Sequence, residues 1–422
     1  MLQTIESINN AVNNFIWGVP AMICIIGVGL YLTLRTNFLQ IRKFPYALKT
    51  TLGRIFKKKE ASDGSMTPFQ AVCTALAGTV GTGNIAGVAG AIAIGGPGAV
   101  FWMWISAILG MCTKFTEVTL AVHFRERNKK GDYVGGPMYY IKNGLSKKWQ
   151  ILAILYSAFG VLTVFGTGNA TQVNTITTAI DTALINFNII PESASKTLNL
   201  VLGIVIMLLV GMVLLGGVKR IGSVSEKLVP FMALFYVLGC IVILGINYDY
   251  IIPAITTICR LAFQPGAAAG GLVGSGIMLA MRYGVARGLF SNESGMGSAP
   301  IAAAAAQTRN PVRQALVSST GTFWDTVVVC LMTGLVLVST IMKNPAINAN
   351  EITDGGVLTS LAFDQIPIIG PLILVVGIIS FAFSTILGWA YYGERCVEYF
   401  AGKKGLIPYR VLYIAVAVIA PV

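Results

Sequence analysis

An apolar stretch long enough to cross a bilayer is interrupted at its centre by closely spaced glycines. Residues 69–94 read FQAVCTALAGTVGTGNIAGVAGAIAI, with Gly78, Gly81 and Gly83 ahead of Asn84. A glycine inside a helix costs roughly 1 kcal/mol relative to alanine, so this pattern predicts that the helix opens here. Opened backbone at membrane depth is tolerated only inside protein or beside a water-filled cavity, where freed amides attract anions and freed carbonyls coordinate cations. A close helix-packing face of small residues is the alternative interpretation.

The composition is that of a membrane protein. Of the 422 residues, 55% are hydrophobic and 11% are charged, whereas soluble domains have about 25% charged residues. The length suits about ten or eleven spans of ~20 residues. The start, MLQTIESINN, has no basic region ahead of an apolar one, so we expect no cleaved signal peptide. The seven cysteines lie mostly within apolar runs and are expected to be free thiols.

The sequence contains no pattern typical of an enzyme. Its only histidine is His123, and no CxxC, HExxH or GxSxG occurs. The stretch GTGNIAG resembles a dinucleotide fingerprint, but no strand precedes it and its surroundings are membrane-apolar. The net charge of +13 is concentrated between the apolar runs, as the positive-inside rule requires, and does not indicate nucleic acid. We therefore expect neither an enzyme nor a cofactor.

Basic loops set the predicted orientation. A first span is predicted over residues 15–34, and residues 35–59 form a loop rich in lysine and arginine with no acid before Glu60. That loop is expected in the cytoplasm, which places the N-terminus outside. Part of the loop could lie flat on the membrane, and a solvated basic linker is the other interpretation. Further spans of alternating direction are predicted over residues 69–94, 100–122, 149–185, 198–215 and 228–246.

A second apolar segment is interrupted in a corresponding place. Residues 266–306 contain RYGVARGLFSNESGMGSAP, which breaks any helix near residues 291–297. The first broken span runs outward and the second runs inward. Paired discontinuous helices in inverted halves indicate the central site of a transporter. Spans over residues 316–342 and 366–399, and one beginning at Tyr409, complete the chain.

These patterns predict an all-α polytopic membrane protein with two inverted five-helix repeats. We divide the chain into residues 1–66, an extra N-terminal span with the basic cytoplasmic loop; residues 67–265, the first repeat; and residues 266–422, the second repeat. The second repeat has room for four spans, so we expect a fifth beyond residue 422. We expect the protein in the inner (plasma) membrane.

Charged residues inside the predicted spans are candidates for function or for pairing. Lys114 and Glu117 lie three apart on one predicted helix, and we expect them to pair with each other. Glu293, at the second break, can either bind a cation or a substrate amine or hold the unwound segment in place; we favour the second role. Asp325 is a weaker candidate for the same two roles.

The stretch FAFSTILGW, residues 381–389, offers a set of oxygen ligands. Ser384 and Thr385 supply hydroxyl oxygens, and the carbonyl of Phe381 lies one turn upstream. Serine and threonine side chains commonly donate hydrogen bonds back to their own helix, so this pair alone is weak evidence for a cation site. Beside a broken helix that exposes carbonyls, it predicts a sodium site, because hard cations prefer oxygen ligands.

Several of these motifs together resemble one family. The stretches GTVGTGNIAGVAGAIAIGGPGAVFWMW, KFTEVTLAVHFR, GGPMYYI and LFSNESGMGSAPIAAAAA are similar to those of the alanine/glycine:cation symporter family, the sodium–alanine symporters. The resemblance covers residues 67–399. It implies the LeuT-type inverted-repeat fold, and sodium-coupled uptake of alanine and glycine by alternating access.

The resemblance also implies site residues. The amide of Gly83 would face the substrate carboxylate, and the backbone carbonyls of the second break would receive the ammonium. Phe290, Met296 and Trp389 would wall the side chain. The substrate residues implied are Thr79, Thr82, Gly83, Phe165, Gly168, Gln172, Phe290, Ser291, Asn292, Gly295, Met296 and Trp389. The single sodium site implied uses the carbonyls of Ala77, Val80 and Phe381 and the hydroxyls of Ser384 and Thr385.

Two other classes of membrane protein are alternatives. A channel would also place glycines and carbonyls at mid-membrane, but it would not need two inverted halves. A receptor or scaffold would not need the broken helices. The expected partners are alanine or glycine, sodium as the coupling ion and membrane lipid, and we expect the protein to act as a monomer.

Overall fold

A computed structural model describes residues 2–16, 18–55, 65–129, 131–263, 276–344, 347 and 355–421. Almost all of this is helix; the strands in these ranges are β1 (Glu126–Arg127) and β2 (Tyr133–Val134), an antiparallel pair. Within these described ranges, six helices are long and apolar enough to cross a membrane. The chain is therefore a multi-pass membrane protein. The end of the predicted basic loop, the start of the second repeat and most of residues 345–354 lie outside the described residues.

The N-terminal span differs from the prediction of one helix over residues 15–34. The structure has helix α1 (Leu2–Ile16) and a separate helix α2 (Val19–Arg35), with Pro20 in the first turn of α2. Proline has no backbone N–H and fits only at the start of a helix, so the chain restarts its helix there. The basic loop that follows forms α3 (Leu39–Arg42) and α4 (Phe44–Ile55), and Phe44 packs edge-on against Phe323.

The first repeat begins with the predicted broken span. Helix α5 (Pro68–Thr79) is separated from α6 (Ala86–Gly95) by the short 3₁₀ turn Thr82–Asn84. The spans that follow are α7 (Gly98–His123), α9 (Gln150–Phe165) continuing through a π-helical turn (Gly166–Ala170) into α10 (Thr171–Asn186), α11 (Ser195–Leu215) and α12 (Gly217–Ile246). Two shorter helices, α8 (Pro137–Gly144) and α13 (Ile251–Leu261), lie between and after them.

The second repeat begins with the second broken span. Helix α14 (Ile277–Asn292) is separated from α15 (Ser298–Ala304) by residues 293–297. The elements that follow are α16 (Pro311–Thr322), a π-helical segment (Phe323–Cys330), α17 (Leu331–Lys343), α18 (Gly355–Phe363) and α19 (Ile369–Ile419). At Gly402, with φ 61°, the chain of α19 reverses, so this segment makes two spans, as the sequence predicts.

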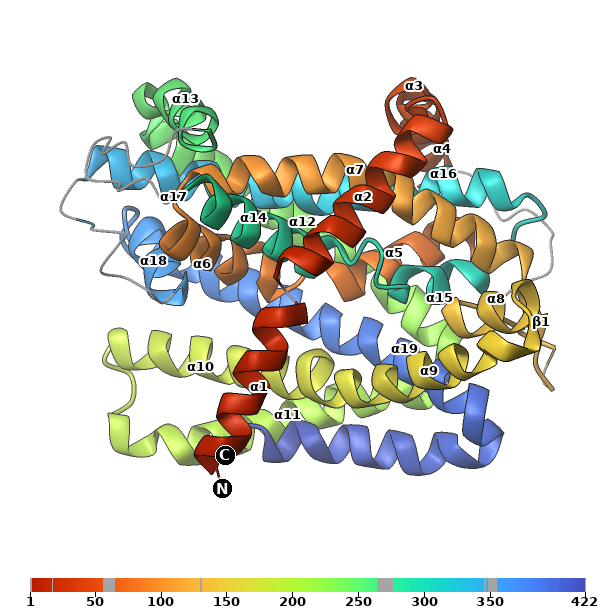
Figure 1. Cartoon of the computed structure of the whole chain (residues 1–422). Helices are drawn as coiled ribbons and strands as arrows, with labels where there is room; N and C mark the ends of the chain where they lie inside the picture. Colours follow the sequence, from red (N-terminus) through yellow and green to blue (C-terminus); the bar gives the residue numbers. More distant parts are fainter. Residues whose placement is uncertain are drawn as a thin grey trace.

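The long helices run side by side across Figure 1. One end of the molecule, here called the α13 end, carries α13, α18 and the connection from α10 to α11. The opposite end, called the α8 end, carries α4, α8 and the β1–β2 pair. Both broken spans lie between these ends. The α13 end holds the loops predicted to be outside, and the α8 end holds the basic loops predicted to be inside.

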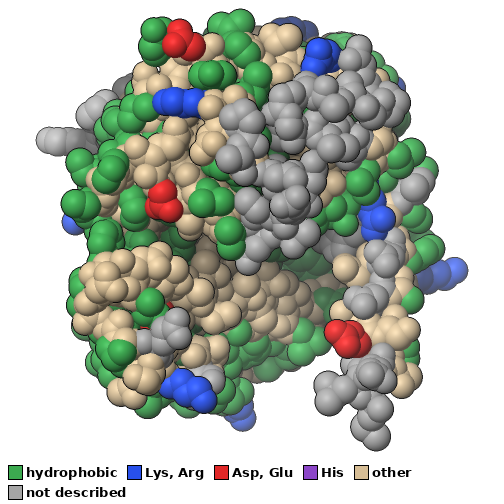
Figure 2. All heavy atoms as spheres, turned by 90° about the vertical axis from the view of Figure 1, so that its left-hand side faces the viewer, with side chains coloured by type: hydrophobic (Ala, Val, Ile, Leu, Met, Phe, Trp, Pro, Cys, Tyr) green, Lys and Arg blue, Asp and Glu red, His purple; other side chains and the backbone are tan. Residues whose placement is uncertain are grey.

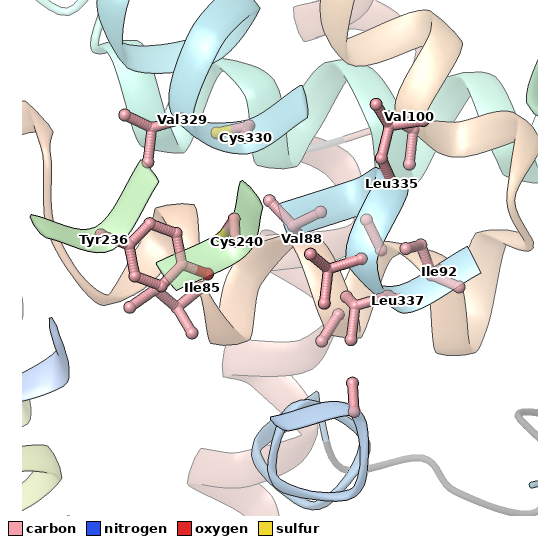
Figure 3. Packing of buried hydrophobic residues seen from close by; sticks show 14 of the residues in the cluster. Ile85, Val88, Ile92, Val100, Tyr236, Cys240, Val329, Cys330, Leu335 and Leu337 are labelled. Carbon is pink, nitrogen blue, oxygen red and sulfur yellow. The ribbon is translucent and has the colours of Figure 1, made fainter. Parts of the chain in front are cut away.

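A hydrophobic core holds α6, the second half of the first broken span, in place. Val88 and Ile92 of α6 pack against Val100 of α7 and Leu335 of α17 (Figure 3). In the same core the hydroxyl of Tyr236 lies 2.9 Å from that of Thr333. Thr333 in turn donates to the carbonyl of Asn84 at 2.8 Å. The core therefore fixes the position of the first break as well as burying apolar surface.

Candidate functional site

The first break opens because an asparagine side chain replaces helical hydrogen bonds. The amide of Gly81 donates to Oδ1 of Asn84 at 2.8 Å, so it does not close a helical turn onto the carbonyl of Ala77. The amide of Asn84 donates to the carbonyl of Gly81 at 3.1 Å, which leaves the carbonyl of Val80 without the amide of a continuous helix. The two carbonyls predicted to bind sodium, those of Ala77 and Val80, are therefore released by the break.

Two backbone amides are released at the same place. Thr82 and Gly83 open the 3₁₀ turn, whose internal hydrogen bonds are donated by Asn84 and Ile85. Within the described residues the amides of Thr82 and Gly83 have no acceptor, and both residues line the cavity described below. Unpaired amides in a first turn attract negative groups. This arrangement matches the role predicted for Gly83.

Asp325 connects the two breaks. Its Oδ1 accepts from Nδ2 of Asn84 at 2.8 Å, and its Oδ2 accepts from the hydroxyl of Ser291 at 2.8 Å. The hydroxyl of Thr326 also donates to Oδ2, at 2.7 Å. The carboxylate is fully buried within the π-helical segment. Of the two roles considered for Asp325, these contacts fit the structural one.

The second break is opened in the same way as the first. The amide of Ser294 donates to Oδ1 of Asn292 at 3.0 Å, and the amide of Gly295 donates to Oε2 of Glu117 at 3.2 Å. In a continuous helix these amides would have bonded to the carbonyls of Phe290 and Ser291. Those two carbonyls are therefore available to a ligand, as predicted for the substrate ammonium.

The predicted pair of Lys114 and Glu117 does not form as expected. Nζ of Lys114 donates to the carbonyl of Asn292 at 2.5 Å, while Glu117 accepts from Gly295. Both side chains reach from α7 to the second break, where the unwound backbone leaves a carbonyl and an amide without helical partners. The carbonyl of Asn292, which we expected to receive the substrate ammonium, therefore already accepts from the ammonium group of Lys114.

Glu293 lies at the turn of the second break. Its backbone is left-handed, with φ 55°, a conformation that few residues other than glycine adopt. The side chain is buried, accepts a hydrogen bond from Ser298 and lines the cavity. The Ser298 contact fits the structural role that we favoured, and the position on the cavity wall keeps a substrate role open to test.

The predicted sodium ligands converge on a small volume beside the first break. The hydroxyls of Ser384 and Thr385 donate back to their own helix, at the carbonyl of Phe381, at 2.8 and 3.0 Å, as the alternative interpretation expects. The hydroxyl of Ser384 also lies 3.4 Å from the carbonyl of Val80, across the first break. A Cβ added at Gly81 would lie 2.5 Å from Oγ1 of Thr385, so only glycine allows this approach. This set of hydroxyl and carbonyl oxygens suits a hard cation.

Most of the predicted substrate residues lie on the wall of one cavity of about 500 Å³. The first break, the second break and α19 each contribute to it. Its lining includes the predicted residues Thr79, Thr82, Gly83, Gln172, Phe290, Met296 and Trp389, together with Thr385 of the sodium set. Gln172 also accepts a hydrogen bond from the hydroxyl of Thr82 at 3.3 Å. The structure thus brings together residues from four distant stretches of sequence.

The remaining predicted residues lie beside the cavity but not on its wall. Ser291 and Asn292 point toward Asp325 and Thr326, and Gly295 bonds to Glu117. The side chains of Ser291 and Asn292 and the backbone amide of Gly295 therefore hold the second break in place on the side away from the cavity. The backbone carbonyl of Ser291 is the part of this group that stays available to a ligand.

Two residues predicted from the third core helix, Phe165 and Gly168, do not line the cavity. Phe165 packs against Tyr409 and Tyr413, and Gly168 packs so closely on Trp389 that an added Cβ would lie 2.6 Å from that residue's own Cβ. The prediction assumed a regular α-helix through Gln172, whereas the turn Gly166–Ala170 is π-helical, so the residues ahead of Gln172 are rotated relative to it.

Several residues on the cavity wall were not predicted. Thr163 and Thr167 line the cavity in place of Phe165 and Gly168, because the π-helical turn adds one residue between them and Gln172. In the stretch RYGVARGLF, Arg282, Ala286 and Phe290 recur every four residues. This helical spacing could have predicted that one face of α14 lines the cavity. The unpredicted lining residues are Asn13, Gly78, Gly81, Thr163, Thr167, Arg282, Tyr283, Ala286 and Arg287; Glu293, already a candidate from the sequence, lines the cavity with them.

The cavity faces the α13 end of the molecule. Figure 2 looks at that end and shows a hollow between the connection from α10 to α11 and the elements above it. Hydrogen bonds close the side of the cavity toward the α8 end. Met66 and Ala306 form a β-bridge, and the guanidinium of Arg125 donates to the carbonyls of Ala304, Ala306 and Thr308 at 3.1, 2.9 and 2.6 Å. Among the described residues, these contacts close the side of the cavity toward the α8 end.

Comparison with known proteins identifies the family of the chain and its fold. An uncharacterized transporter of Haemophilus influenzae is 53% identical over 414 residues, 97% of this chain and 86% of the relative. The sodium/alanine symporter AgcS of Methanococcus maripaludis is 47% identical over 413 residues, 97% of this chain and 87% of the relative. The crystal structure of MhsT in complex with L-phenylalanine has the same LeuT-type fold, with a TM-score of 0.59 at 15% identity over 85% of this chain and 80% of that one. The sequence pattern of the sodium:alanine symporter family matches residues 2–422, and the chain belongs to that family of transporters.

Proposed function

We propose that this protein couples inward movement of sodium to the uptake of alanine, and also of glycine. The observation that supports the proposal most strongly is the release of carbonyls and amides by two broken helices around one cavity. The relative from Methanococcus maripaludis is named as a sodium/alanine symporter, which agrees with this assignment. Neither a channel nor a receptor requires a pair of broken helices in inverted halves, whereas a transporter of this kind does.

The zwitterionic substrate lies between the two breaks. Its carboxylate accepts from the free amides near Gly83, with the hydroxyls of Thr79 and Thr82 beside them. Its ammonium donates to the free carbonyls of Phe290 and Ser291. The small side chain packs against Phe290, Met296 and Trp389, which leave room for a methyl group or a hydrogen. Gly295 and Asn292 keep the second break open.

Sodium occupies the neighbouring oxygen cluster. Its ligands are the carbonyls of Ala77, Val80 and Phe381 and the hydroxyls of Ser384 and Thr385. The sodium and substrate ligands share the short stretch of backbone from Ala77 to Gly83, so fixing one set orders the other. Sodium therefore raises the affinity for alanine, and alanine raises the affinity for sodium by the same factor.

We assign the protein to the inner membrane as a monomer surrounded by lipid, with its N-terminus outside. The division of the chain at residues 66 and 265 into an extra span and two inverted repeats belongs to the same proposal. The α8 end, with its basic loops, would then face the cytoplasm.

Uptake of labelled alanine into proteoliposomes tests the proposal. An inward sodium gradient is expected to drive accumulation above the external concentration, and labelled glycine is expected to compete. An equal potassium gradient serves as the control and should give no accumulation. Equal uptake under both gradients would refute sodium coupling, and the absence of any alanine uptake by well-folded protein would refute the substrate assignment.

A further inference from the structure

The wall of the cavity that leads from the α13 end toward the breaks is positively charged. One face of α14 lines this wall with Arg282, Tyr283, Ala286, Arg287 and Phe290. These positions repeat at the spacing of a single helical face. The charged residues among the described lining are two arginines and Glu293. Glu293 lies at the second break, and the two arginines lie on the part of the wall nearer the α13 end.

The two arginines are arranged in series along the path of the substrate. At a rise of about 1.5 Å per residue, Arg287 is about 4.5 Å from Phe290 along the α14 axis, and Arg282 is a further ~7.5 Å toward the α13 end. Helix α14 runs from that end toward the second break (Figure 1). A molecule that moves inward along α14 therefore passes Arg282, then Arg287, and then reaches the breaks.

Of the two arginines, Arg287 is the one whose side-chain surroundings the structure describes more completely. Its side chain is partly buried, and within the described ranges its guanidinium makes no hydrogen bond or ion pair. A partly desolvated guanidinium is stabilised by an anion, and its planar fork of donors fits a carboxylate in a bidentate manner. Thr163 and Thr167, from another element of the wall, add hydroxyl groups to the same cavity.

We propose that Arg287 forms a carboxylate subsite that holds the incoming amino acid before it reaches the breaks. The inference rests on the proposed function, because it assigns the ligand as the transported amino acid. The subsite is separate from the free amides near Gly83, which hold the carboxylate in the final position. It recruits substrate and leaves the later steps of transport unchanged.

The subsite predicts a particular kinetic pattern. Losing a charge-assisted contact weakens binding by about tenfold, so Arg287→Gln is expected to raise KM for alanine about tenfold. The maximal rate should change by less than about twofold, since the final site is intact. Arg287→Lys should recover part of the loss, because it keeps the charge but not the fork of donors. The rise of KM with ionic strength should be smaller in Arg287→Gln than in the wild type.

The experiment is sodium-driven uptake of labelled alanine by the full chain in proteoliposomes, at low and at moderate salt. Arg260→Gln is the matched control, because Arg260 is exposed on α13 at the same end of the molecule and its loss removes the same charge. This control should keep the wild-type KM. An equal rise of KM in both variants would overturn the subsite in favour of long-range attraction by the whole end.

A second arm distinguishes the substrate carboxylate from a small inorganic anion. With gluconate in place of chloride, wild-type KM should stay the same or fall. If uptake instead requires chloride, and Arg287→Gln removes that requirement, the guanidinium holds chloride and the carboxylate assignment is wrong. A wild-type KM in a well-folded, active Arg287→Gln variant overturns the subsite alone. If the wild type takes up no alanine under a sodium gradient, the proposed function fails and the subsite fails with it.

Discussion

At the scale of single residues, two asparagines decide which backbone groups are free. Oδ1 of Asn84 binds the amide of Gly81, and Oδ1 of Asn292 binds the amide of Ser294. Each side chain diverts an amide from the carbonyl that it would meet in a regular helix. Glycine makes the local opening possible, but the asparagine determines which carbonyls are presented to the cavity. The same device therefore operates at both breaks.

Removing one hydroxyl from the oxygen cluster tests the sodium assignment. Thr385→Ala is expected to raise the sodium concentration needed for alanine binding by about tenfold or more, because a contact to a charged partner contributes about 1.5–3 kcal/mol. Thr385→Ser, which keeps the hydroxyl, should restore the titration. Ser380→Ala on the same helix removes a hydroxyl that bonds to the carbonyls of Val376 and Gly377, and should change nothing. Sodium titrations of equilibrium alanine binding measure all three, and an unchanged midpoint in Thr385→Ala would exclude this residue.

The size of the side-chain pocket is tested at Met296. Met296→Ala should admit serine or valine, with discrimination changed by about 1–3 kcal/mol per methylene. Trp389 is a poorer place for this test, because its ring packs on Gly168 and its Nε1 donates to the carbonyl of Gly78 at 3.3 Å. Competition by unlabelled amino acids against alanine uptake gives the answer. If Met296→Ala rejects every larger neutral amino acid, Met296 does not wall the pocket.

At the scale of the elements, the π-helical segments explain where sequence reasoning succeeded and failed. The two breaks are predictable, since glycine and asparagine act within a few residues of themselves. The face of the third core helix is not, because a π-helical turn has no sequence pattern as clear as a glycine pair. Because of this turn, Thr163 and Thr167 line the cavity, whereas the sequence predicted Phe165 and Gly168. Contacts between distant helices, such as Lys114 with Asn292, are likewise invisible to periodicity.

The α8 end is closed by contacts that must open for alanine to leave on that side. Arg125→Ala removes the donor to three carbonyls next to the Met66–Ala306 bridge. The amides of Met66 and Gln307 should then exchange hydrogen at least about tenfold faster, because the bridge opens more often. Arg127→Ala, two residues away and stacked on Tyr133, is the matched control. Hydrogen exchange read by mass spectrometry measures both, and equal protection in Arg125→Ala and the wild type would remove Arg125 from the closure.

At the scale of the whole molecule, the placement of basic loops predicts which end faces the cytoplasm. Asn188, in the exposed connection from α10 to α11, lies at the α13 end, and Lys129 lies beside the β1–β2 pair at the α8 end. In a background lacking native cysteines, Asn188→Cys should react with a membrane-impermeant maleimide in intact cells. Lys129→Cys should react only after permeabilisation. The reverse pattern would invert the topology and place the N-terminus inside.

The central claim is that backbone groups freed at the two breaks, and not a side-chain clamp, hold the charged ends of the substrate. Calorimetric titration of alanine in saturating sodium, with Gly83→Ala and Glu293→Gln beside the wild type, tests it most directly. A Cβ at Gly83 would lie 3.3 Å from the ring of Phe290, so it crowds the free amides and the cavity wall together. We predict that alanine binding weakens at least about tenfold in Gly83→Ala and at most about threefold in Glu293→Gln, a difference of about 0.7 kcal/mol or more. Wild-type affinity in Gly83→Ala, together with abolished binding in a folded Glu293→Gln, would contradict the account and identify a carboxylate–ammonium clamp instead.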